Sequence, residues 1–278
     1  MKCITLGHTP DADDAFMFFG IAIGKVTSAF FDVEHVVDDI ETLNKRAINH
    51  ELDVTAISVH AYAYTEDYTI LHSGGSFGLD YGPVVIAKKP MDREELRHAV
   101  IAVPGQMTSA NLLLKLAIGN FDSKEMIFSS IPNAVSSGSV DAGLLIHEAQ
   151  ISLRDKFYTV IDLGKWWHVL SQGMPVPLGI NVASRRSMTV DEINKFDSFF
   201  RDSIEYGLKN MDEAVDYAMK YARGNAKELI ERFVRMYVNQ LTINMGSEGE
   251  RSITFLLNKA RREKFLTFGE IVFSRDDK

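Results

Sequence analysis

Strand-like and helix-like patterns alternate along most of this 278-residue chain. Residues 3–7, 31–37 and 54–58 are candidates for strands, and between them the segments 13–23 and 40–49 are candidates for helices. Strands that alternate with helices form sheets that are rich in parallel pairs and covered by helices. The sequence therefore predicts an α/β fold with a parallel-rich sheet.

A second α/β unit begins near residue 99. Its expected elements are strands at 99–103, 125–128 and 143–146 and a helix at 109–117. Residues 190–264 follow with a helical pattern, in which we expect three helices. No linker rich in Pro, Gly or Ser separates the units, so they belong to one folded body.

This order of elements predicts two lobes. We expect residues 1–88 and 178–278 to form the first lobe and residues 89–177 to form a second lobe inserted into it. The segments 83–88 and 178–184 would connect the lobes as hinge strands. A ligand cleft is expected between the lobes, because sites between two lobes close by hinge motion.

Charge and composition limit the classes of partner and the kinds of site that we expect for this chain. The formal net charge of −8 and the pI of about 5.5 argue against nucleic acid or an anionic membrane as the main partner. Cys3 is the single cysteine, which excludes an intramolecular disulfide and a cysteine-based metal cluster. No apolar run approaches the ~18 residues of a membrane span, and the first residues are typical of a strand rather than a signal peptide. We expect a cytoplasmic protein without membrane contact.

The segment 140–148 ends in an ionisable pair. Residues 143–146 are typical of a buried strand, because they are nearly all apolar, too short for a helix, and preceded by a turn-like Ser-Ser-Gly-Ser at 136–139. In an open α/β sheet the carboxyl end of a strand faces the ligand crevice. His147, followed by Glu148, is therefore a candidate for taking or giving a proton there. The alternative interpretation is a polar strand end that a backbone group satisfies.

Residues 104–110, Pro-Gly-Gln-Met-Thr-Ser-Ala, join a predicted strand to a predicted helix. Thr108 or Ser109 is a good N-cap, so one interpretation is a capped helix. In the other, the free N–H groups, the helix dipole and two hydroxyls bind an anion, such as the carboxylate of a small-molecule ligand. Ser58 has two comparable interpretations, as a donor into the crevice and as the cap of the next helix.

The acidic segment after the first strand has no clear metal signature. Asp11, Asp13 and Asp14 suggest Mg²⁺, but no downstream acidic cluster joins them at a clear spacing. We predict that they cap the next helix and stabilise its dipole at the edge of the crevice. The glycine-rich segment 73–78 matches neither the Walker A nor the Rossmann pattern, so no nucleotide cofactor is expected.

The chain also resembles a known family. The matching segments follow one another over nearly its whole length: residues 39–44, 73–75, 82–83, 103–105, 108–110, 142–148, 162–164, 166–167, 175–179, 237–239, 246 and 248–251. Ile-His-Glu at 146–148 and Trp-Trp at 166–167 are the most specific. On these segments the chain resembles the 1,4-dihydroxy-6-naphthoate synthases, the lyases of the futalosine route to menaquinone.

The resemblance implies a periplasmic-binding-protein-like fold of type 2, in which two lobes with a ligand cleft between them serve as an enzyme. It implies cyclic dehypoxanthinyl futalosine as substrate, release of its sugar-derived portion, and a reaction without metal or redox cofactor. His147 corresponds to the family's proposed general base. Ser58, Ser109 and Ala110 correspond to residues that line the ligand site, where Thr108 and the helix N-terminus would join them in holding the carboxylate.

The resemblance is incomplete in the first loop, where Thr-Pro-Asp-Ala-Asp-Asp at 9–14 replaces the family's Ser-Pro-Cys-Pro-Asn-Asp. Two added carboxylates near the crevice would repel an acidic ligand. Two other functions stay open: a chorismate dehydratase-like enzyme, whose site motifs match less well, and a solute-binding protein of the same fold for a small carboxylate. The sequence does not give the oligomeric state.

Overall fold

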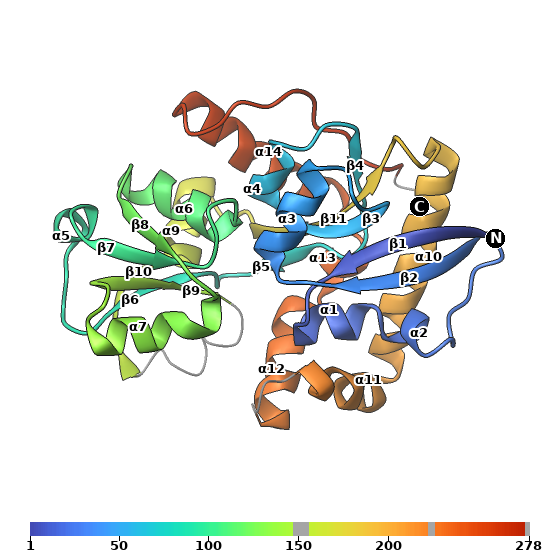
Figure 1. Ribbon diagram of the computed structural model, residues 1–278, viewed down its shortest axis with the longest axis horizontal. Helices are drawn as coiled ribbons and strands as arrows, with labels where there is room; N and C mark the ends of the chain where they lie inside the picture. Colours follow the sequence, from blue (N-terminus) through green and yellow to red (C-terminus); the bar gives the residue numbers. More distant parts are fainter. Residues whose placement is uncertain (147–155, 222–225, 276–278) are drawn as a thin grey trace.

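The computed structural model describes residues 1–146, 156–221 and 226–275, which form two lobes, each built on its own β-sheet (Figure 1). The first sheet has the strand order β2-β1-β3-β11-β4, and β5 pairs with β11; the second has the order β10-β6-β9-β7-β8. The chain leaves the first sheet between β5 and β6 and returns between β10 and β11. The predicted two-lobed α/β fold is confirmed, whereas the predicted lobe limits, 1–88 and 178–278 against 89–177, stay a prediction.

The strands of the first sheet are β1 (Lys2–His8), β2 (Phe31–Val37), β3 (Val54–Ser58), β4 (Tyr68–Ile70), β5 (Ser76–Gly78) and β11 (Val176–Ser184). β1 runs parallel to β2 and β3, and β11 runs antiparallel to β3, β4 and β5. The parallel register sets Leu6 opposite Val54. As a result β1 and β3 end on the same side of the sheet.

The strands of the second sheet are β6 (Val84–Ala87), β7 (Val100–Val103), β8 (Asp122–Glu125), β9 (Ala142–Leu145) and β10 (Tyr158–Asp162). β7 runs parallel to β8 and β9, and β6 runs antiparallel to β9 and β10. The expected strand at 125–128 is wrong, because β8 precedes it. β8 is an exposed edge strand of polar residues and so lacks an apolar signal, and Phe128 already begins the 3-10 helix η1 (Phe128–Ser130).

Both sheets are mixed, so the expectation of a parallel-rich sheet is only partly right. β6 and β11 run against their neighbours, and they are the first strands after each passage between the lobes. A pattern of alternating strands and helices carries no information on such reversals, since the strand direction depends on where the chain crosses between the lobes.

The described α-helices are α1 (Ala12–Met17), α2 (Phe19–Ala22), α3 (Ile40–Ile48), α4 (Val59–Tyr62), α5 (Arg93–Arg97), α6 (Ser109–Ile118), α7 (Ile131–Ser137), α9 (Leu163–Ser171), α10 (Val190–Lys209), α11 (Met211–Ala218), α12 (Lys227–Tyr237), α13 (Gln240–Ile243) and α14 (Gly246–Arg262), with a 3-10 turn η3 (Met219–Tyr221) after α11. The single helix expected over 13–23 is two helices that meet at Phe18. The helical C-terminal segment is expected to hold three helices, with breaks near 209–210 and 223–225, the second of which lies outside the described residues. The break at Asn210 is present, and the segment holds more helices than expected because α12, α13 and α14 are separated by further breaks at residues 238–239 and 244–245.

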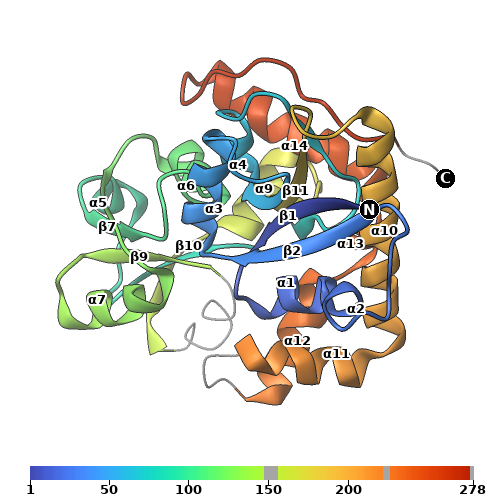
Figure 2. The same ribbon diagram turned by 45° about the vertical axis from the view of Figure 1, so that its right-hand side comes forward.

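Apolar clusters on both faces of each sheet hold the lobes together. In the first lobe α1, α2, α11 and α12 lie on one face of the sheet and α4 and α14 on the other (Figure 2). The largest cluster includes Ile57 of β3, Leu112 of α6 and Leu256 of α14. This cluster therefore continues from one lobe into the other and fixes how the two sheets face each other.

Candidate functional site

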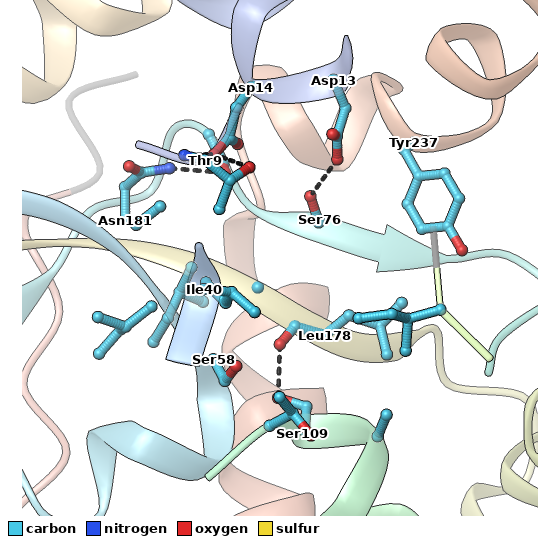
Figure 3. A pocket seen from close by; sticks show the side chains of 18 of the residues that line it. Thr9, Asp13, Asp14, Ile40, Ser58, Ser76, Ser109, Leu178, Asn181 and Tyr237 are labelled. Atoms are coloured by element: carbon cyan, nitrogen blue, oxygen red, sulfur yellow. Dashed lines mark hydrogen bonds between the residues drawn. The ribbon is translucent and has the colours of Figure 1, made fainter. Parts of the chain in front are cut away.

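A pocket lies between the two sheets and is lined from both lobes. Its open space measures about 730 Å³, which includes the solvent at its mouth. Its polar lining consists of Thr9, Asp13, Asp14, Ser58, Ser76, Thr108, Ser109, Asn181 and Tyr237. In Figure 3, Thr9, Asp13 and Asp14 lie on one side, Ser58 and Ser109 on the opposite side, and Ile40 and Leu178 between them.

The carboxyl ends of four strands meet at this pocket. β1 leads into Thr9 and β3 ends at Ser58, while β7 leads into the loop before Thr108 and β9 is followed by Ile146. Ligands of open α/β sheets bind outside the carboxyl ends of the strands. The pocket therefore occupies the place where the sequence predicts a ligand crevice.

The N-terminus of α6 forms one wall of the pocket. Thr108 is the N-cap, and its Oγ1 accepts the Asn111 N–H at 3.3 Å and donates to the Gly105 carbonyl at 2.9 Å. The first N–H groups of a helix find no acceptor within the helix, and Ser109 and Ala110, which carry two of them, both line the pocket. The first turn of α6 contains no acidic residue. The positive end of its dipole therefore remains available to an anion.

The Ser109 hydroxyl is engaged between the lobes. It donates to the Leu178 carbonyl of β11 and accepts the His60 N–H at 3.4 Å. Thr108 and Ser109 both line the pocket, but their hydroxyls have different partners: Thr108 caps the helix, and Ser109 ties it to the first lobe.

Ser58 ends β3 and stands at the N-cap position of α4, yet its side chain makes no cap hydrogen bond. Its N–H donates to Asn44 Oδ1 at 2.8 Å, and its Oγ accepts from Asn44 Nδ2 at 3.3 Å. A hydroxyl that accepts a hydrogen bond keeps its own proton for donation. The structure therefore favours Ser58 as a donor into the pocket over Ser58 as a helix cap.

The N-terminus of α1 forms the opposite wall. Asp14 Oδ2 accepts the Thr9 N–H at 2.7 Å and the Thr9 hydroxyl at 2.8 Å, and Ser76 Oγ donates to Asp13 at 3.5 Å. Asp13 and Asp14 lie in the first turn of α1, as expected for dipole stabilisation. Asp11 occupies the N-cap position without a side-chain cap bond, so the capping expected of it is wrong; Asp14 reaches back to the loop instead.

A buried histidine lies behind each wall. His60 Nδ1 lies 3.2 Å from the Thr108 carbonyl, and burial lowers the pKa of His60 to about 4. Behind the α1 wall, His8 lies 3.2 Å from the Thr9 carbonyl through Nδ1 and 3.1 Å from His35 Nδ1 through Nε2. Burial lowers the pKa of His8, and burial together with the neighbouring His8 lowers the pKa of His35 to about 4. These rings are therefore neutral near pH 7.

The predicted site residues thus fall into two groups. Ser58, Thr108, Ser109 and Ala110 all line the one pocket. His147 and Glu148 lie outside the described residues. Ile146, which immediately precedes His147 in the chain, lines the pocket.

Sequence reasoning missed the side of the pocket formed by β11 and α12. Asn181 of β11 donates through Nδ2 to the Gly74 carbonyl at 2.9 Å, and Phe233 and Tyr237 reach the pocket from α12. A buried asparagine within an apolar strand was an available signal for Asn181. The residues of α12 gave no local signal, because only the packing of the C-terminal helices against the first sheet brings them to the pocket.

Two further features concern the described residues alone. No three of their His, Cys, Asp or Glu side chains converge in a way that would hold a metal ion. None of their helices has both the length and the apolar character that crossing a bilayer requires.

The comparisons with known proteins agree in sequence and in fold. The family described as menaquinone biosynthesis matches residues 4–262. A 1,4-dihydroxy-6-naphthoate synthase of Thermus thermophilus is 37% identical over 94% of this chain and 94% of its own length, and one of Streptomyces coelicolor is 30% identical over 94% and 93%.

Solved structures show the same fold. A crystal structure of an Archaeoglobus fulgidus protein, 46% identical, superposes with a TM-score of 0.90 and covers 95% of this chain and 98% of its own. The alkanesulfonate-binding protein of Xanthomonas axonopodis pv. citri, 12% identical, has a TM-score of 0.69 over 98% and 96%. The fold is therefore that of the periplasmic binding proteins, as the resemblance implied.

Proposed function

Because this chain belongs to the menaquinone biosynthesis family of 1,4-dihydroxy-6-naphthoate synthases, we propose that it is the lyase that converts cyclic dehypoxanthinyl futalosine to 1,4-dihydroxy-6-naphthoate. The observation that carries the proposal is the 37% identity over 94% of both chains to a synthase of that name. The pocket supports it, since a naphthoate carries the kind of anionic group that a helix N-terminus binds. The proposed location is the cytoplasm.

We assign the general base to His147. Ile146 lines the pocket, and the Cα atoms of consecutive residues lie only ~3.8 Å apart. Histidine can take a proton from a substrate near neutral pH. In the proposed reaction His147 takes a proton from a substrate carbon, and the electron pair of that bond starts the elimination of the sugar-derived portion. Formation of the aromatic ring drives the reaction forward.

The wall at α6 would hold the substrate carboxylate. Ser109 and Ala110 carry free first-turn N–H groups at the pocket, and Ser58 adds a hydroxyl donor. These groups supply binding and orientation, which leaves proton abstraction to His147. The ligand class proposed for the pocket is therefore a small carboxylate.

Incubation of the purified protein with cyclic dehypoxanthinyl futalosine, followed by mass spectrometry, tests this function. We expect 1,4-dihydroxy-6-naphthoate to form. A solute receptor would return the compound intact, and that result would overturn the proposal.

The base is tested by His147→Asn. Loss of a general base typically lowers the rate ~10²–10⁴-fold, so we expect a drop of that size in kcat with the fold retained by circular dichroism. The exposed His98 offers a matched control, because its side chain is 79% exposed and His98→Asn should leave kcat unchanged. Near-parent activity of His147→Asn would exclude His147 as the base.

A further inference from the structure

Glu41 of α3 reaches from the first lobe to the second although it does not line the pocket. The residue is only 4% exposed. Its carboxylate accepts the Met107 N–H of the second lobe, with the nitrogen 3.2 Å from both Oε1 and Oε2. Met107 directly precedes Thr108, the N-cap of α6. The carboxylate therefore holds the loop that leads into the open helix N-terminus.

Gly105 makes this approach possible. A Cβ atom added at Gly105 would lie 2.4 Å from Glu41 Oε2 and 2.6 Å from its Cδ. Real Cβ atoms do not come that close, so any side chain at position 105 would displace the carboxylate. The absence of a side chain at position 105 thus leaves the space that the Glu41 side chain of the other lobe occupies.

The same carboxylate also reaches Ser58. Asn44 Nδ2 donates to Glu41 Oε2 at 3.2 Å and to Ser58 Oγ at 3.3 Å, while Asn44 Oδ1 accepts the Ser58 N–H at 2.8 Å. Asn44 is fully buried. One hydrogen-bonded chain therefore runs from the Met107 N–H through Glu41 and Asn44 to Ser58, and it joins the polar groups that the two lobes contribute to the pocket.

We propose that Glu41 is a positioning residue that clamps the N-terminus of α6 to Ser58, so that the two lobes present their donors to one carboxylate at a fixed spacing. The inference deepens the proposed function and rests on it for the identity of the ligand. A group held by donors from both lobes binds tightly only when both sets are in place. Glu41 thus acts on substrate affinity, whereas His147 acts on the chemical step.

Two other effects of Glu41 must be separated from the proposed clamp: its charge, and its simple contribution to the contact between the lobes. Burial raises the pKa of the Glu41 carboxyl, and the bonds from Met107 and Asn44 counter that rise. Lys45, on the same helix, makes a second contact between the lobes, an ion pair with Glu125 at 3.6 Å, but both side chains are largely exposed. Exposed pairs contribute little. Lys45→Ala is therefore a matched control for loss of an interlobe contact.

The first test is Glu41→Ala. Loss of hydrogen bonds to a charged group lowers affinity ~10–100-fold, so we expect KM for cyclic dehypoxanthinyl futalosine and the Kd for 1,4-dihydroxy-6-naphthoate to rise by that factor, with kcat within about threefold. Glu41→Gln keeps one acceptor oxygen and should give an intermediate loss. Lys45→Ala should leave KM and Kd within about twofold. A fall in kcat at unchanged KM would overturn the clamp.

The second test works from the other side of the contact and does not depend on Glu41→Ala being well folded. Gly105→Ala should raise Kd about tenfold in the parent, because the new methyl group displaces the carboxylate. In a Glu41→Gly background, which also removes the Cβ atom that would lie 2.9 Å from the new methyl group, the same change should have little effect. Additive losses in this double-mutant cycle would show that the two residues act independently, and the proposal would be wrong.

Hydrogen exchange separates this inference from the proposed function. The backbone amide of Met107 should be protected in the parent and exchange faster in Glu41→Ala, whether or not any ligand is turned over. If the parent fails to convert the futalosine compound but this protection is lost in the variant, only the proposed substrate is wrong. Equal exchange of the 104–108 segment in both proteins would overturn the clamp itself.

Discussion

The two helix N-termini on opposite sides of the pocket differ in what occupies their positive ends. At α1, Asp13 and Asp14 lie in the first turn, and Asp14 is bonded to Thr9. At α6 the first turn holds no acidic residue, and Thr108 satisfies a single N–H. The chain's own carboxylates therefore occupy one helix dipole, while the other is left for a ligand.

This difference between the two walls predicts how an acidic ligand is oriented in the pocket. An acidic ligand is repelled at the α1 wall and attracted at the α6 wall, so its carboxylate should point toward Ser109 and Ala110. Under the proposed function, the extra aspartates of the first loop would orient an acidic substrate rather than exclude it. Because the two walls belong to different lobes, contacts such as Glu41 to Met107 set their relative position.

The largest effect on ligand binding is expected when the N-terminus of α6 is given a carboxylate like those of α1. Ala110 lines the pocket and is 4% exposed. Ala110→Asp would place a carboxylate where we expect the ligand's own, and two like charges ~4 Å apart repel by about 4 kcal/mol at an intermediate dielectric. We expect at least ~100-fold weaker binding of 1,4-dihydroxy-6-naphthoate by calorimetry.

The neutral variant Ala110→Asn controls for the size of the new side chain. It should lose clearly less affinity than Ala110→Asp, because it fills the same space without charge. Equal losses would mean that shape rather than charge governs this wall.

The α1 wall should respond in stability rather than in binding. Asp14→Ala removes the acceptor of the buried Thr9 N–H and hydroxyl, and an unsatisfied buried donor costs about 1–3 kcal/mol. We expect the free energy of unfolding in urea to fall by that amount. Asp14→Asn, which keeps an acceptor oxygen, should lose less stability. If Asp14→Ala lost more ligand affinity than stability, the anionic group of the ligand would bind at the α1 wall and not at the α6 wall.

The contrast between the walls also shows what the sequence can predict. The strands and the loop that carry Ser58, Thr108 and Ser109 were predictable, since local patterns fix them and parallel strands bring their ends together. Which hydroxyl caps α6 was not predictable. Thr108 and Ser109 are both good caps, and only the position of Leu178 on β11, across the lobe boundary, engages Ser109.

Long-range geometry limited the rest of the prediction. Glu41 lies in a segment that the family resemblance includes, yet its role depends on how α3 faces the 104–108 loop of the other lobe. Tyr237 reaches the pocket only because α12 packs on the first sheet. No periodicity within either helix carries that information, because it depends on tertiary packing alone.

Acidification should lower the free energy of unfolding through the histidines behind both walls. The pKa values of His60 and His35 are lowered from 6.5 to about 4 by burial, so the unfolded chain binds more protons between these limits. The stability that the two neutral rings contribute is complete above pH 6.5 and is lost as the pH falls toward 4. The slope is at most about 1.4 kcal/mol per pH unit for each ring.

Urea unfolding of the parent at pH 7, 6 and 5 measures this slope. His60→Gln, at the α6 wall, and His35→Gln, at the α1 wall, should each reduce the slope of the free energy of unfolding against pH by the contribution of one ring. A parent whose free energy of unfolding is constant from pH 6.5 to 5 would contradict the neutral state of both rings.

The smallest expected effect separates capping from binding at α6. Thr108→Ala removes the oxygen that accepts the Asn111 N–H, and loss of such a cap costs about 1 kcal/mol of stability. The N–H groups of Ser109 and Ala110 remain, so the Kd for 1,4-dihydroxy-6-naphthoate should change less than about threefold. Thr108→Ser keeps the hydroxyl and should match the parent in both measurements. If Thr108→Ala instead lost tenfold in affinity at unchanged stability, its hydroxyl would bind the ligand directly. The α6 wall would then rely on side chains, as the α1 wall does, and the contrast between the two helix N-termini would disappear.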